Sequence, residues 1–152
     1  MEELPRWISI IYRFSRIHLN SRFHSLNLGI TSSQHFFIRR ICTNPGITQD
    51  KLKLLINLNK SNITRTLDAL EKGGFIRKER HERDGRTARL FLTEAAEKIH
   101  PVIVSEVNSW IDTLLKDFTE EEISLFDSML RKVAKTALEK AETFGDCVAD
   151  EV

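Results

Sequence analysis

Apolar residues recur at the spacing of an α-helix along most of the chain. The first such stretch spans residues 6–26 and carries Trp7, Ile10, Ile11, Phe14, Ile17 and Phe23 between polar residues. The next, "SSQHFFIRRICTN", begins where Thr31 or Ser32 can cap a helix, and Asn44-Pro45-Gly46 ends it. These patterns predict an N-terminal helix that ends at Leu28-Gly29-Ile30, followed by a second, shorter helix.

Two short helices with a tight break between them are predicted next. Thr48 is placed to cap the first, whose buried side is predicted to consist of Leu52, Leu55 and Ile56. Residues 57–59 form the break, since asparagine tolerates the left-handed backbone conformation. The second helix spans residues 59–73, with Asn59 as its cap, Ile63, Leu67 and Leu70 facing inward, and Gly73-Gly74 at its end. This layout is typical of a helix-turn-helix.

A small basic hairpin is predicted directly after the second of these helices. "FIRKER" and "RLFLT" have the alternation and composition of two strands. Between them, Asp84-Gly85 predicts a two-residue turn, because both positions tolerate positive φ. A hairpin placed after a helix-turn-helix makes a winged helix, with the wing at residues 80–90.

Helical spacing returns in the C-terminal third. It involves Ile99, Val102, Ile103, Val107, Trp110, Ile111 and Leu114, and Pro101 is predicted to kink this helix or to mark the point where it restarts. Thr119 and Glu122 form a capping box for a last helix. The buried side of that helix is predicted to consist of Ile123, Phe126, Leu130, Val133, Ala137 and Leu138.

The chain is therefore predicted to be a single domain, mainly α with a small β-hairpin wing. A winged helix-turn-helix lobe at residues 31–97 is flanked by helices at 1–30 and 98–144, with a frayed tail at 145–152. Trp7, Phe14, Trp110, Phe118 and Phe126 exceed what a small winged helix can cover, so the flanking helices require a partner surface.

The charge of the chain is unevenly divided. The net charge is only +1, but residues 1–100 carry 18 basic and 10 acidic side chains, and residues 101–152 carry 5 and 12. Such asymmetry favours an anionic partner for the first part. The 152 residues include no long apolar run and no secretory signal pattern, so we expect a cytoplasmic protein without a membrane span. We find no glycine-rich phosphate loop, no Gly-x-Ser-x-Gly motif and no paired carboxylates, and we expect neither an enzyme nor a bound cofactor.

The outward face of the helix at 59–73 suits double-stranded DNA. With the apolar residues inward, Ser61 and Arg65 project outward and Asn62 and Thr64 lie on the flanks, a set that can contact base edges in the major groove. Lys60 is placed to meet a phosphate. Taken alone, this face is also what any amphipathic helix presents to solvent.

The arginines of the hairpin give that face a second contact. Arg86 at the predicted tip suits a narrow minor groove, and Arg83 and Arg89 can meet phosphates. Asp84 can brace an arginine or the turn backbone. The alternative to DNA binding is a winged helix that contacts an acidic protein. The salt dependence of binding distinguishes a DNA partner from a protein partner.

The run "NKSNITRTLDALEKGGFIRKERHERDGRTARLFLTEAAEK" resembles the MarR family (multiple antibiotic resistance regulators) of winged-helix transcription factors. It has Lys60-Ser61-Asn62-Ile63-Thr64-Arg65, the wing's Asp84-x-Arg86 and Leu92-Thr93-Glu94 at the exit. The resemblance implies a homodimer with interlaced terminal helices, a pseudo-palindromic operator, and release by a small ligand, commonly a phenolic or other aromatic acid. Repression is the expected effect, because a dimer seated on a promoter blocks polymerase. The sequence departs from the family at Asn57 and Ala96, where glycine is usual, and at Pro101.

The resemblance also indicates where an effector would bind. The family's pocket lies between the terminal helices and the DNA-binding lobe, and here it would draw on Phe14, His18, His35, Phe36 and Arg39. The alternative is that these residues only pack the junction. Metal sensing would use His18, His24, His35 or His100 with Glu106, without any His-x-x-x-His spacing, and redox sensing would use Cys42.

Overall fold

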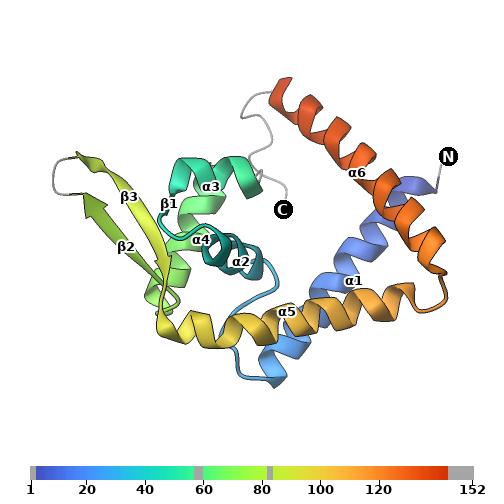
Figure 1. The fold of residues 1–152 in the computed structure, drawn as a ribbon, viewed down its shortest axis with the longest axis horizontal. Helices are drawn as coiled ribbons and strands as arrows, with labels where there is room; N and C mark the ends of the chain where they lie inside the picture. The colour runs from blue at the N-terminus through green and yellow to red at the C-terminus, as the bar shows by residue number, and fades with distance from the viewer. Residues whose placement is uncertain (1–2, 57–59, 82–83, 144–152) are drawn as a thin grey trace.

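The computed structural model describes residues 3–56, 60–81 and 84–143. Its elements, in chain order, are α1 (Leu4–Ser25), α2 (His35–Thr43), β1 (Ile47–Thr48), α3 (Gln49–Ile56), α4 (Lys60–Lys72), β2 (Ile76–His81), β3 (Asp84–Leu92), α5 (Glu94–Leu115) and α6 (Glu120–Thr143). Helices α2, α3 and α4 and the sheet form one lobe, and α5 runs from that lobe to α1 and α6 at the other end (Figure 1). The predicted mainly α fold with a small hairpin is therefore confirmed.

The N-terminal helix ends where the sequence predicts. Asn27 takes a φ of +52°, and the amide of Leu28 donates to the carbonyl of Phe23 at 3.0 Å, which closes the last turn of α1. The predicted cap of the second helix is wrong, because α2 begins only at His35. Thr31 donates its amide to Gln34 Oε1 at 2.9 Å, and Ser32 donates its amide to Asn20 Oδ1 at 2.7 Å. These residues thus form a turn that ties the loop to α1 instead of opening a helix.

The helix-turn-helix pair is confirmed in its core. The amide of Lys51 donates to Thr48 Oγ1 at 3.3 Å, so Thr48 caps α3 as predicted. Leu52 on α3 is fully buried, as are Ile63, Leu67 and Leu70 on α4. The prediction for Leu55 is wrong, because this residue is 42% exposed. Gly74 takes a φ of +76° and ends α4 as expected, whereas the predicted break at residues 57–59 lies outside the described residues.

The sheet has three antiparallel strands in the order β1-β3-β2, and the sequence did not predict β1. Ile47 pairs with Leu90, and the amide of Gly46 donates to the carbonyl of Leu90 at 2.9 Å. The predicted Asp84-Gly85 turn is wrong, because both residues lie in β3 and Asp84 pairs with His81. The pairing shifts between Arg80, which faces Ala88, and His81, so extra residues of β3 are taken up within the ladder as a bulge.

Helix α5 continues through Pro101 without interruption. The amide of Ala96 donates to Thr93 Oγ1 at 3.3 Å at its start, and α5 then continues through Pro101 to Leu115. The prediction that the helix restarts at Pro101 is therefore wrong. Proline removes one backbone hydrogen bond from a helix, and the complete burial of Ala96 and Ile103 on either side of Pro101 offsets that loss.

The last helix begins as predicted but does not bury its apolar side within one chain. Thr119 and Glu122 exchange amide-to-side-chain hydrogen bonds at 2.8 and 3.3 Å, which is the predicted capping box. Leu130 and Val133, however, are 49% and 56% exposed, and Phe126 and Leu138 are exposed as well. The predicted burial of these four side chains is therefore wrong for the single chain. Over the described ranges, no helix combines the length and apolarity needed to cross a bilayer.

Candidate DNA-binding interface

Helix α4 presents a polar edge opposite its buried side. Ser61, Thr64 and Arg65 are exposed, and Asn62 is partly buried. Lys60 is the first residue of α4, although its side chain lies outside what the structure describes. Because Ile63, Leu67 and Leu70 anchor the other side, rotation of α4 about its axis would expose fully buried residues, so the polar edge is held in one orientation.

A glutamine that the sequence did not single out joins the two helices of the pair. Gln49, the first residue of α3, donates from Nε2 to Thr64 Oγ1 at 2.7 Å. The bond links the N-terminal end of α3 to the exposed edge of α4. Glutamine at this position has no motif signature, so only the packing of α3 against α4 reveals its partner.

The hairpin also carries basic side chains. Arg89 is exposed on β3. Its neighbour on the same face of the sheet, Phe91, lies under the guanidinium of Arg77 at 4.7 Å from the ring centroid, and Arg77 also pairs with Glu79. Asp84 and Arg86 belong to β3, but their side chains lie outside the described part of the chain, and Arg83 lies outside the described residues altogether.

A groove of about 560 Å³ lies between the lobe and α1. Its lining includes Tyr12 and Arg16 from α1, Phe36 and Arg40 from α2, and Arg65 from α4. Asn62 also lines the groove, so the groove adjoins the polar edge of α4. Among the described residues, its lining contains three arginines and no acidic side chain, a charge that favours an anion.

The structure places the five residues predicted for an effector pocket on two helices, α1 and α2. Phe36 lines the groove, while Phe14 is exposed on α1. His18 stacks on Trp110, with ring centroids 4.1 Å apart, and thereby packs α1 against α5. The fourth and fifth, His35 and Arg39, lie on α2.

His35 is a buried neutral histidine. Its Nδ1 donates to the carbonyl oxygen of Ser32 at 2.5 Å, and its ring packs against Phe23 and Phe36. Burial, opposed by the hydrogen bond to Ser32 and assisted by the charge of Arg39, lowers the pKa of His35 to about 4. At neutral pH this side chain therefore serves packing rather than charge recognition.

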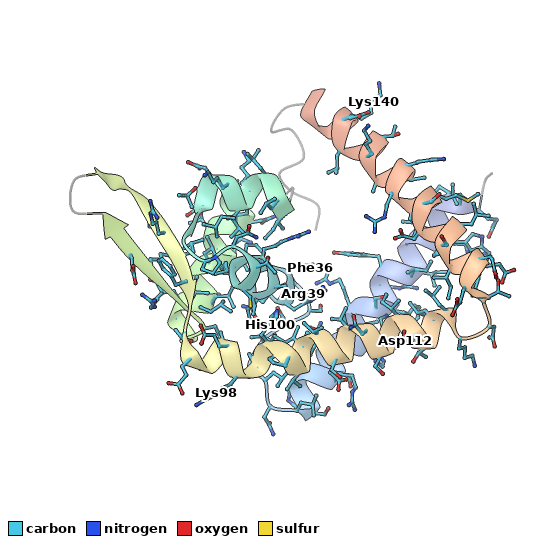
Figure 2. All side chains as sticks on the ribbon, in the orientation of Figure 1. Phe36, Arg39, Lys98, His100, Asp112 and Lys140 are labelled. Atoms are coloured by element: carbon cyan, nitrogen blue, oxygen red, sulfur yellow. The ribbon has the colours of Figure 1, made fainter. Side chains whose placement is uncertain are left out.

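Cys42 has a neighbour that its own helix does not supply. Its Sγ lies 3.7 Å from Nδ1 of His100 on α5. Partial burial and the nearby charge of Arg39 lower the pKa of His100, so the imidazole is neutral at neutral pH. Figure 2 shows Arg39 and His100 where α2 approaches α5. Across the described residues, no group of three or more histidine, cysteine, aspartate or glutamate side chains is arranged to hold a metal ion.

Comparison with known proteins matches the chain to one family. A model of the MarR family matches residues 30–88. The chain is 33% identical over 135 residues to an uncharacterized HTH-type transcriptional regulator, YybA of Bacillus subtilis (strain 168), with 89% of each chain covered.

Solved structures share nearly the whole fold. The transcriptional regulator SlyA superposes with a TM-score of 0.87 at 30% identity, over 93% of this chain and 99% of that one. A putative MarR family transcriptional regulator from Listeria monocytogenes, complexed with 26mer DNA, superposes with a TM-score of 0.82 at 31% identity, over 92% of each chain.

Proposed function

Since the chain belongs to the MarR family of winged-helix, DNA-binding transcriptional regulators, we propose that it binds a pseudo-palindromic operator as a homodimer and represses transcription. Helix α4 enters the major groove, and the wing lies in the adjacent minor groove. The observation that carries this proposal is the exposed edge of Ser61, Thr64 and Arg65 on a helix whose other side is fully buried. Hydroxyl and guanidinium groups are those that contact base edges and phosphates.

The apolar surface outside the lobe supports a dimer. Residues of α1, α5 and α6 leave large apolar side chains exposed in the single chain, including Trp7, Ile11, Ile111, Leu125, Met129 and Leu130. A monomeric protein rarely exposes so many large apolar side chains on neighbouring helices. A second copy related by a two-fold axis covers it and presents two α4 helices to half-sites about one turn of DNA apart.

Binding of a dimer to DNA also indicates the effect on transcription and the cellular location. A dimer on a promoter excludes polymerase without further contacts, which favours repression over activation. A regulator of this kind works beside the chromosome, so its place is the cytoplasm. The family consists of regulators, and the proposed activity is binding without catalysis.

We propose the groove beside α4 as the effector site. Aromatic side chains of Tyr12 and Phe36 and the guanidinium groups of Arg16 and Arg40 suit a small aromatic acid. Arg65 belongs to both the groove and the exposed edge of α4, so an acid bound there competes with DNA for the same side chain. Oxidation at Cys42 is the alternative trigger, and its neighbour is the neutral His100.

Fluorescence anisotropy tests the proposed function. The probes are a labelled duplex from upstream of the chain's own gene and a random duplex of equal length, each titrated over a salt series. We expect preferential binding to the upstream duplex that weakens steeply with salt, because each phosphate contact releases counterions. Arg65→Ala is expected to weaken this binding by about tenfold or more, within the range for a lost base contact.

Lys116→Ala is the matched control, because Lys116 is an exposed basic residue after α5, remote from the lobe. Equal losses for the two variants would contradict the assignment of α4 as the recognition helix. Equal, weak binding of both duplexes would contradict DNA recognition itself and direct the search to an acidic protein partner.

A further inference from the structure

Lys78 occupies an unusual position for a lysine. Side chains alternate along β2, and Lys78 falls on the same face as the buried Ile76, with the buried Leu90 opposite it on β3. Its side chain is only 23% exposed. A strand of a basic wing could carry its lysines on the outer face, where they would meet solvent or phosphate, but this one is turned toward the helices.

The ammonium group of Lys78 joins two carboxylates on α4. Its Nζ lies 2.7 Å from Asp68 Oδ1 and 2.8 Å from Glu71 Oε2. Asp68 and Glu71 are three residues apart, so they lie one above the other on the same side of the helix. Partial burial disfavours the charge of Lys78, but the hydrogen bonds and proximity of both carboxylates raise its pKa above the ordinary value. The lysine is therefore charged under all conditions in which the protein binds DNA.

We call the contact of Lys78 with Asp68 and Glu71 the clamp. It joins α4 to the hairpin, the two parts proposed to contact DNA. Asp68 and Glu71 belong to the second half of α4, on the C-terminal side of Ser61, Thr64 and Arg65. Lys78 is in the middle of β2, and beyond it the hairpin projects away from the helices (Figure 1). The angle at which the wing leaves the lobe therefore depends on what holds β2 to α4 at this point. The same contact also pairs two negative charges that would otherwise face a polyanion.

We infer that Lys78 is a positioning residue that, through Asp68 and Glu71, fixes the wing relative to α4 so that both reach their grooves together. The inference rests on the proposed function. It differs from a direct phosphate contact, because the ammonium group is directed at the lobe and is already paired twice. It also differs from an ordinary surface ion pair, which contributes little to stability and nothing to the geometry of distant groups.

Footprinting of a duplex selected by the wild-type protein from a random-sequence library separates the two grooves. Dimethyl sulfate reports guanine N7 in the major groove, and hydroxyl radicals report sugars along the minor groove. In Lys78→Met, which keeps the length of the side chain but not its charge, we expect the major-groove protection at the centre of each half-site to remain. The minor-groove protection at the flanks should disappear, with affinity weakened about tenfold, the order of one lost groove contact.

Two variants serve as controls for Lys78→Met. Lys98→Met removes an equivalent charge, one that pairs with Glu94 at 2.7 Å on α5, and should leave both protections unchanged. Lys78→Arg keeps the charge and should keep the flanking protection. Loss of both protections together in Lys78→Met, with a lower melting temperature, would show a structural role and overturn the inference.

A double-mutant cycle decides whether Lys78 acts through its partners. In the background Asp68→Asn with Glu71→Gln, the change Lys78→Met should weaken binding by less than about twofold, because the clamp is already absent. An undiminished loss there, with a salt slope smaller by about one, would show a direct phosphate contact instead and overturn the inference. If the wild-type protein selects no DNA, the proposed function fails, and the role of Lys78 fails with it.

Discussion

The winged-helix lobe and the long helices outside it are built on different principles. In the lobe, apolar residues from α2, α3, α4 and the sheet close on one another, and Phe37, Leu52, Leu67 and Leu90 are essentially inaccessible to solvent. Outside it, burial stops partway along each helix. The buried residues of α1 lie near its C-terminal end, those of α5 lie in its first half, and α6 has none among its described residues.

The contacts outside the lobe are of another kind as well. Arg22 on α1 donates to both carboxylate oxygens of Glu106 on α5, at 2.7 and 3.1 Å, and Trp110 donates from its indole to Ser15 Oγ at 2.8 Å. These bonds hold α1 beside α5 within the chain but leave the apolar sides of α1 and α6 open. The difference indicates that one chain completes the DNA-reading lobe, whereas two chains are needed to complete the rest.

The largest expected effect lies in the core of the lobe. Leu67→Ala removes a fully buried side chain from the centre of α4's inner face, and it should lower the free energy of unfolding by about 3–4 kcal/mol. The loss should be independent of protein concentration, because the lobe closes within one chain. Urea denaturation at two protein concentrations measures it, with Leu54→Ala, at a highly exposed site on α3, as the control. A loss of under 1 kcal/mol for Leu67→Ala would contradict the account of the core.

His35, at the junction of α1 and α2, should make stability depend on pH. Its pKa is lowered to about 4 in the folded protein, so the unfolded chain binds a proton first as the pH falls below about 6.5. The resulting stability is fully present above pH 6.5 and is lost between pH 6.5 and 4, on the order of 3 kcal/mol in total.

Thermal unfolding of the wild type and of His35→Gln between pH 6.5 and 4 checks whether stability falls as the pH falls. Glutamine cannot titrate, so the variant should lack the part of the pH dependence that His35 causes, although its stability at pH 7 will be lower. His24→Gln is the matched control, because His24 is exposed near the end of α1. The same steep decline in both variants would assign the titration to another group.

On α6, a charge should separate chains without unfolding the lobe. Leu130→Asp places a carboxylate in the exposed apolar side of α6, and we expect the dimer to dissociate at about 30-fold or more higher concentration, equivalent to roughly 2 kcal/mol. Analytical ultracentrifugation measures the association constants of the wild type and of Leu130→Asp. Lys132→Asp, at an exposed polar position on the same helix, is the control. An unchanged association constant would mean that α6 is not part of the interface.

The smallest expected effect is within the recognition surface. Gln49→Ala and Thr64→Val each remove the hydrogen bond between α3 and α4, so their losses in operator affinity should not add. We expect a coupling free energy of about 0.5–1 kcal/mol, typical of one hydrogen bond. Anisotropy titrations of the two single variants and the double variant measure it, and additive losses would show that the residues act independently.

The sequence predicts the parts of this molecule that depend on local patterns. Ile63, Leu67 and Leu70 follow a helical period, Thr119 and Glu122 form a local capping box, and Gly74 supplies a backbone conformation that few residues adopt. Each of these signals lies within one element, so no tertiary information is needed to interpret it.

The wrong and missing predictions concern residues whose conformation is set by contacts with other elements. Asp84-Gly85 has the composition of a turn, but pairing with β2 places it in β3. Strand β1 is only two residues long and has no period to detect, and Pro101 is tolerated because burial on both sides holds α5 together. Gln49 and Lys78 have no local signature at all, since Gln49 bonds to Thr64 on α4 and Lys78 bonds to Asp68 and Glu71, also on α4.

Sedimentation velocity of the protein bound to its selected operator duplex measures how many chains bind one duplex. We expect one complex with two 17.6 kDa chains per duplex and no stable complex with a single chain. Under the same conditions, a duplex cut to one half-site should bind far more weakly. A complex with one chain per duplex, as tight on the half-site as on the full operator, would contradict the division of the molecule into a self-sufficient reading lobe and an interface completed by a second copy.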